Sequence, residues 1–180
     1  MGPILVGRLT AVNGYTPRMA FATTATRLWK RLSREERLTA AASFWHEPPE
    51  AMVGLALGAI AKARRMRPQA ARALHEEARA NVLAGILDPG ESLAASLLVA
   101  LHLGSRRPLL AAFLDALGLP HDNGVLQEEE GEGPPPSADA TAHAVAALAA
   151  FPRHEVETYF NTLWLQDPER WGALETAAVS

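Results

Sequence analysis

Helix start and stop signals recur along the whole chain, and they constrain its fold more than any other feature. Ser33-Arg-Glu-Glu36 is a capping box, in which both side chains accept hydrogen bonds from free backbone N–H groups at a helix start. Pro68 and Pro108 suit the first turn of a helix, where a backbone N–H is not needed. Asp88, followed by Pro89, and Ser137 are predicted N-caps. Gly118-Leu-Pro120 is typical of the segment that follows a helix end. We therefore predict a series of short helices.

Composition supports a helical fold, because 35 alanines and 25 leucines stand against nine valines and three isoleucines. The lack of cysteine excludes disulfide scaffolds, cysteine-ligated zinc, iron–sulfur clusters and thiol nucleophiles. We predict an all-α protein, an irregular bundle of about seven to eight helices with a short C-terminal helical tail. Arg67-Pro68 and Arg107-Pro108 open helices 40 residues apart, so HEAT-like helix pairs remain an alternative.

Apolar spacing places the predicted helices between these signals. They cover about residues 25–32, 34–46, 49–66, 68–87, 89–104, 107–117 and 137–150, followed by one that begins at Pro152 and a last short one capped by Asp167. Residues 51–61 are apolar on all sides, which predicts a buried helix, since a bilayer span needs about 20 such residues. Gly54 and Gly58 on that helix favour close packing, within the chain or between subunits.

The chain divides at an acidic segment rich in glycine and proline. Residues 127–137 (QEEEGEGPPPS) have no apolar periodicity and are predicted to be a linker between a main helical domain over 22–126 and a tail over 138–180. The tail is expected to dock on the main domain or on a partner subunit. Residues 1–21 are predicted to be a loose arm without a secretory signal, and a cytoplasmic protein without membrane attachment is expected.

The charge is unevenly distributed. Residues 1–79 carry a net charge of +7 and residues 80–180 one of −10, against −3 for the whole chain. Two basic clusters account for the positive half: Arg27, Lys30, Arg31, Arg34 and Arg37, and then Lys62, Arg64, Arg65, Arg67 and Arg72. Arg64, Arg65 and Arg67 are a candidate basic surface that could neutralise phosphates. The alternative is that they lie at the C-terminal end of a helix, where the negative end of the helix dipole stabilises positive side chains. The acidic residues of 80–180, in the same chain or in the other subunit of a dimer, are another candidate partner for these basic clusters.

Signatures of catalysis are lacking in the sequence. It contains no HExxH, GxGxxG, Walker or GxSxG motif, so we predict no cofactor and no metal and favour a protein that is not an enzyme. His102, with Arg106 one helical turn later, and His121 in the following loop form a candidate cleft for a general base or a ligand. The alternative for His102 is a buried histidine bonded to a backbone carbonyl.

The leading hypothesis is a protein–protein interaction or oligomerisation module that binds itself or another protein. Packing signals are abundant, whereas catalytic signals are not. Nucleic-acid binding through the basic helices is the second hypothesis. An enzyme or small-ligand binder with a site in a helical cleft near His102 and His121 is the third.

Overall fold

A computed structural model describes residues 21–22, 24–127 and 133–177 of the chain. This part is almost wholly helical, with one two-stranded hairpin, so the predicted all-α fold is confirmed. Apart from Phe21, the predicted arm over 1–21 lies outside the described residues, as do residues 128–132 of the predicted linker and 178–180 of the tail.

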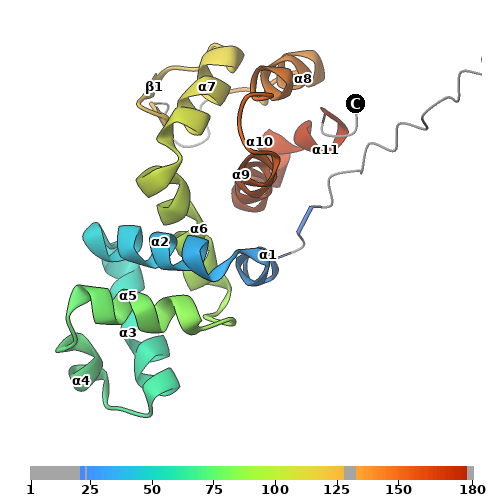
Figure 1. Cartoon of the computed structure of the whole chain (residues 1–180). Helices are drawn as coiled ribbons and strands as arrows, with labels where there is room; N and C mark the ends of the chain where they lie inside the picture. Colours follow the sequence, from blue (N-terminus) through green and yellow to red (C-terminus); the bar gives the residue numbers. More distant parts are fainter. Residues whose placement is uncertain (1–20, 23, 128–132, 178–180) are drawn as a thin grey trace, which may run out of the picture.

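From α1 to α7 the helices follow one another with short connections, whereas residues 118–137, which include the hairpin, separate α7 from α8 (Figure 1). The first six are α1 (Ala25–Arg31), α2 (Arg34–His46), α3 (Glu50–Arg64), α4 (Pro68–Arg72), α5 (Glu76–Gly85) and α6 (Glu91–Ser105). The remaining elements are α7 (Arg107–Leu117), β1 (His121–Asp122), β2 (Val125–Leu126), α8 (Ala138–Ala147), α9 (Arg153–Gln166), α10 (Pro168–Trp171) and α11 (Leu174–Ala177).

Several local signals act as predicted. Ser33 Oγ accepts from the backbone N–H of Glu36 at 3.1 Å, and Glu36 Oε2 accepts from the backbone N–H of Ser33 at 2.8 Å, which completes the capping box of α2. The side chains of Ser137 and Asp167 each accept from a backbone N–H at the start of α8 and α10. Gly118 ends α7 with φ of 68°, a left-handed conformation that glycine adopts without a steric penalty.

Replacing Ser33 with Ala is expected to lower the free energy of unfolding by about 1 kcal/mol, because the N–H of Glu36 loses its acceptor. Urea denaturation at neutral pH measures the difference. Ser33→Thr retains the oxygen and should stay close to the wild type, so equal losses in both variants would argue against the cap.

Two predicted helix boundaries are wrong. The helix expected over 68–87 is interrupted after Arg72, because the turn lets Leu74 pack against the N-terminal core and places Glu76 in the first turn of α5, near its positive dipole end. Asp88 does not cap α6. Gly90 is the N-cap, with φ of 91°, and Asp88 instead forms an ion pair with Lys30 at 3.2 Å.

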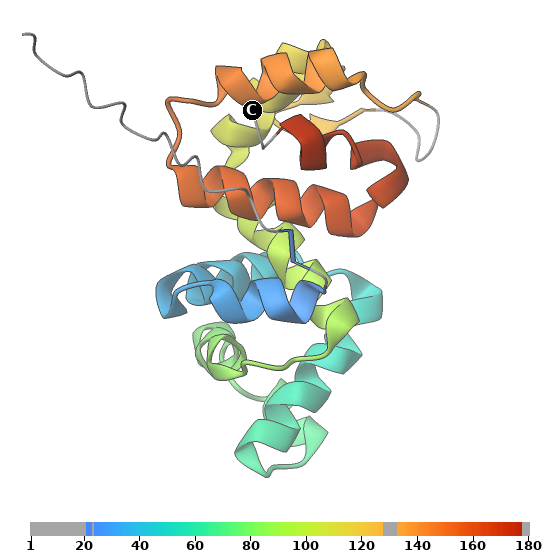
Figure 2. The same ribbon diagram turned by 90° about the vertical axis from the view of Figure 1, so that its right-hand side faces the viewer.

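The described helices form two hydrophobic cores. The N-terminal core gathers buried side chains from α1, α2, α3, α4, α5 and α6, and the C-terminal core gathers those of α7, α8, α9, α10 and α11. The main interfaces of the first core join α2 to α5 and α6, which are not sequence neighbours of α2, so the packing is that of an irregular bundle. In Figure 2 the C-terminal core lies above α1 and α2, and α3 and α4 lie at the opposite end.

Two connections hold the cores together. α6 and α7 are bent by 90° at their junction, which takes the chain from one core to the other. α9 packs on α1 and α6, and the backbone N–H of Ala22 donates to Asn161 Oδ1 at 2.5 Å. None of the described helices is by itself long and apolar enough to cross a membrane, and only the bent pair of α6 and α7 reaches that length and hydropathy together.

Candidate functional site

His102 is buried between α6 and α9, with 2% of its surface exposed. Its Nε2 lies 3.1 Å from Thr162 Oγ1, and the Thr162 hydroxyl donates to the carbonyl oxygen of Thr158 at 2.9 Å. Because the proton of that hydroxyl is already committed, Thr162 accepts from an N–H at Nε2. Nδ1 is then the acceptor nitrogen of the neutral ring, and it has no hydrogen-bond partner within the described part of the chain.

The surroundings of His102 keep it uncharged. Burial and, to a smaller extent, the positive charge of Arg106 together lower the pKa of His102 to about 3, against the opposing effect of a hydrogen bond with the backbone of Thr158. A general base works best with a pKa near the operating pH, so this ring is poorly suited to remove a proton from a substrate. What it can do at neutral pH is accept a hydrogen bond.

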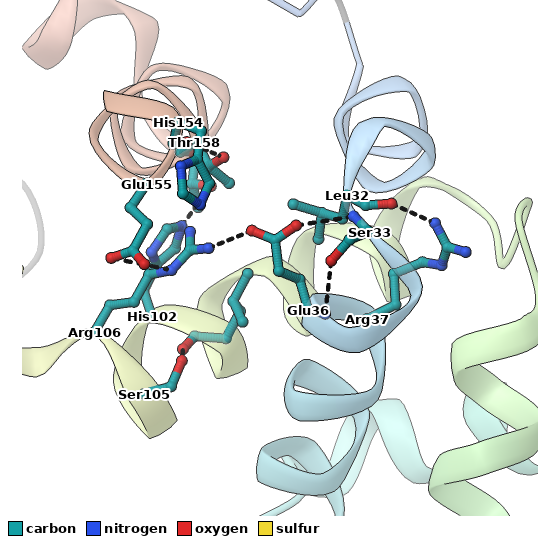
Figure 3. A network of polar contacts seen from close by, with 12 residues as sticks. Leu32, Ser33, Glu36, Arg37, His102, Ser105, Arg106, His154, Glu155 and Thr158 are labelled. Atoms are coloured by element: carbon teal, nitrogen blue, oxygen red, sulfur yellow. Dashed lines mark hydrogen bonds and ion pairs between the residues drawn. The ribbon is translucent and has the colours of Figure 1, made fainter. Parts of the chain in front are cut away.

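Arg106 stands at the bend between α6 and α7 and joins three helices. Its Nη2 lies 2.6 Å from Glu36 Oε1 of α2, and its Nε lies 3.9 Å from Glu155 Oε2 of α9, with 5% of the side chain exposed (Figure 3). Burial alone would raise the pKa of Glu36, but the hydrogen bonds of Ser33 and the charge of Arg106 outweigh it and hold that pKa below its usual range. Arg106 thus fixes the two cores relative to each other.

His121 is held by its own neighbours. Its Nε2 lies 3.1 Å from Asp115 Oδ1 of α7, and its Nδ1 accepts from the backbone N–H of Gly124 at 3.2 Å. The hairpin residues beside it line a pocket at His102, but the side chains of His121 and Arg106 do not. Of the three residues in the predicted cleft, the structure therefore places one, His102, on a concave surface.

The predicted basic surface is exposed at one end of the molecule. Arg64, Arg65 and Arg67 all lie at the junction of α3 and α4, where Arg65 ends α3 with φ of 53°. The acidic residues of α9 lie elsewhere: Glu155 faces Arg106, and Glu157 pairs with Arg153 at 2.8 Å. In the first basic cluster, Arg37 donates to the carbonyls of Ala84 and Leu32 at 2.9 and 2.6 Å, so it supports the fold.

One face of α3 is open. The helix packs against α4, α5 and α6 on the side of Leu57 and Ile60, while Gly54, Leu55 and Gly58 on the other side are exposed. Added Cβ atoms at the two glycines would meet nothing within 4 Å. The prediction of a buried helix is therefore wrong for this face, because no described segment of the same chain covers it.

A groove of about 870 Å³ runs along this face, which we call the α3 face. Leu55 lines the groove and is 51% exposed. Leu87 is 52% exposed and stands in the connection from α5 to α6, between Ile86 and Asp88, which line the groove. Large apolar side chains with half their surface in water are infrequent among the described residues. The residues that line the groove are Gly54, Leu55, Gly58, Ala59, Lys62, Ala63, Ile86, Asp88, Pro89 and Gly90.

No protein-family model, curated protein or solved structure matches this chain. Function is accordingly inferred from the surfaces of the molecule. The sequence singled out His102 and the two glycines of α3, whereas it gave no sign that Trp171, Leu103 and Leu110 would meet beside His102. Those three residues come from different helices, and no local pattern connects them.

Proposed function

We propose that this protein is a homo-oligomerisation module that associates with a second copy of itself through the α3 face. The observation that carries the proposal is the half-exposed Leu55 on a helix that is apolar on all sides. Helices of that kind are normally buried all round, and a contiguous apolar groove on a protein surface favours an interface. The open side of α3 is where such an interface would form.

The occupant is a second copy because the face is complementary to itself. Glu50, Gly54, Gly58 and Lys62 are spaced four residues apart, so they form one row along α3, and all four are exposed. If two copies pair with antiparallel α3 helices about an axis midway between Gly54 and Gly58, Glu50 of each lies opposite Lys62 of the other. Gly54 then lies opposite Gly58, where the backbones can approach closely, as an isologous interface requires.

Gly58→Leu is expected to convert an oligomer into a monomer in light scattering, because the new side chain occupies the closest approach of the two helices. Within one chain a Cβ at Gly58 meets nothing within 4 Å, so the monomer is expected to keep its fold, which circular dichroism can check. Ala142→Leu is the matched control: it adds a leucine to an exposed position of α8, far from the α3 face, and should leave the assembly intact. A wild-type chain that is monomeric at high concentration would refute the proposal.

Charge reversal tests the antiparallel arrangement itself. Glu50→Lys and Lys62→Glu should each weaken self-association by about threefold to tenfold, because each places like charges across the axis. Combining both changes in one chain restores opposite charges and should restore the affinity. Additive weakening in the double variant would contradict this antiparallel pairing.

A further inference from the structure

Positive charge is concentrated at the end of the molecule where α3 passes into α4. Five exposed cations, which we call the basic end, lie there: Lys62, Arg64, Arg65, Arg67 and Arg72. Residues 51–75 contain no aspartate or glutamate, so no acid within this stretch offsets them. In both ribbon views α4 lies at the end of the molecule opposite α8 (Figure 1, Figure 2). The basic end is thus a local positive surface on a chain whose net charge is −3.

The charged groups of the basic end have no partner in the described part of the chain. None of the five side chains forms a hydrogen bond or an ion pair there. By contrast, Lys30 pairs with Asp88, and Arg37 donates to two backbone carbonyls. Like charges gathered in this way repel one another, and a bound polyanion would relieve the repulsion.

The residue types at the basic end favour the phosphates of a duplex. Four of the five cations are arginines, whose planar guanidinium can donate two parallel hydrogen bonds to one phosphate. No phenylalanine, tyrosine or tryptophan occurs between Trp45 and Phe113. The basic end therefore supplies no ring on which the bases of a single strand could stack, and none that would anchor it in a membrane interface. A duplex presents its phosphates densely, with about one charge per 1.7 Å of axis in DNA.

We propose that the basic end binds the phosphate backbone of double-stranded nucleic acid, without regard to base sequence. Its arginines replace counterions that are condensed on the phosphates, and the release of these ions drives association. The basic end adjoins the α3 face, but only Lys62 also lines the groove. The proposal therefore rests on the other four cations and does not depend on self-association.

The salt dependence of binding to a duplex tests the proposal. A labelled 20-base-pair DNA duplex of mixed sequence is titrated with the full chain and followed by fluorescence anisotropy. If about three to five phosphates are neutralised, the affinity should fall about 40-fold to 500-fold between 50 and 200 mM salt. A second duplex of unrelated sequence should bind equally well, and the single strand should bind more weakly. An RNA duplex in the same assay shows which nucleic acid is preferred, and binding of either one supports the proposal.

A triple variant locates the contact. Arg64→Gln, Arg65→Gln and Arg67→Gln together should remove most of the affinity at 50 mM salt, and should reduce the slope of log affinity against log salt by about 2 to 3. Lysine at the same three positions keeps the charges and should keep most of the slope. The matched control removes three exposed arginines from α1 and α2 by changing Arg27, Arg31 and Arg34 to Gln, and should leave most of the affinity.

Circular dichroism shows whether each variant retains its fold, and the wild-type titrations do not depend on any variant. No binding of either duplex at 50 mM salt would overturn the proposal. Equal losses in the two glutamine variants would do the same, because net charge and not the basic end would then govern binding. Binding to phosphatidylserine vesicles but not to a duplex would assign the basic end to a membrane surface instead. Self-association is read separately, from light scattering without nucleic acid.

Discussion

Lowering the pH from 7 to 5 is expected to reduce the free energy of unfolding by about 2 kcal/mol because of His102 alone. The pKa of this group is about 3 in the folded chain, against an ordinary value of 6.5. Between these values the unfolded chain binds the proton and the folded chain does not, so each fall of one pH unit costs about 1.4 kcal/mol of stability. The contribution is complete above pH 6.5 and is lost progressively as the pH falls toward 3.

Urea denaturation at several pH values measures this loss. His102→Phe should show little change over the same interval, because it has no group to protonate at this position. His143→Ala, in which an exposed histidine of α8 is removed, should keep the wild-type dependence. Glu36 acts in a lower window: its pKa is also lowered, so its stabilisation is lost only as the pH falls below its ordinary value of 4.5. Equal stability of the wild type at pH 7 and pH 5 would show that His102 is not held neutral by burial.

Replacing Gly104 with Ala is expected to destabilise the protein by about 3 kcal/mol, because it overpacks the contact between α6 and α2. A Cβ at Gly104 would lie 2.5 Å from the Cβ of Ser43 and closer still to its hydroxyl oxygen. Both atoms belong to a side chain anchored directly on α2, so rotation of the hydroxyl relieves only part of the clash.

A compensating change makes this prediction specific. Ser43→Gly removes both clashing atoms and leaves the Ser43 Cα, 3.8 Å away, as an ordinary van der Waals contact. In the Ser43→Gly background, Gly104→Ala should therefore cost little or should stabilise the helix. Gly85→Ala is the control, since a Cβ there meets nothing within 4 Å and alanine is the better helix former. A Gly104→Ala protein as stable as the wild type in urea would contradict the close approach.

The sequence predicts well those features that depend on residues close together in the chain. The caps at Ser33, Ser137 and Asp167 were predictable because donor and acceptor are three residues apart. The start of α6 was not, because Asp88 pairs with Lys30, 58 residues away, which no local pattern reveals. The carboxylate of Glu91 likewise accepts from Ala25 and Thr26 at the start of α1.

The same limit applies to the candidate sites. The sequence showed that α3 is apolar on all sides, but whether a neighbouring helix of the same chain would cover it depends on the tertiary packing. For His102 it offered both a cleft and a buried position, and the outcome rests on Thr162, 60 residues away. The partners of His121, Asp115 and Gly124, are close to it in the sequence. That each of them contacts one ring nitrogen of His121 depends on the geometry of the hairpin, which the sequence does not reveal.

The bond between Ala22 and Asn161 has a consequence for the newly made chain. During translation α1 leaves the exit tunnel of the ribosome long before α9. The backbone N–H of Ala22, just before α1, therefore lacks its acceptor, Asn161, until α9 has been synthesised. The bond from Trp29 to the carbonyl of Ile86, at 2.8 Å, and the caps from Glu91 also form across large separations. Folding during translation is therefore expected to leave α1 undocked until α6 has been synthesised, and to leave the bond of Ala22 unformed until α9 follows. A nascent chain arrested between these two helices should be open to proteases near Ala22.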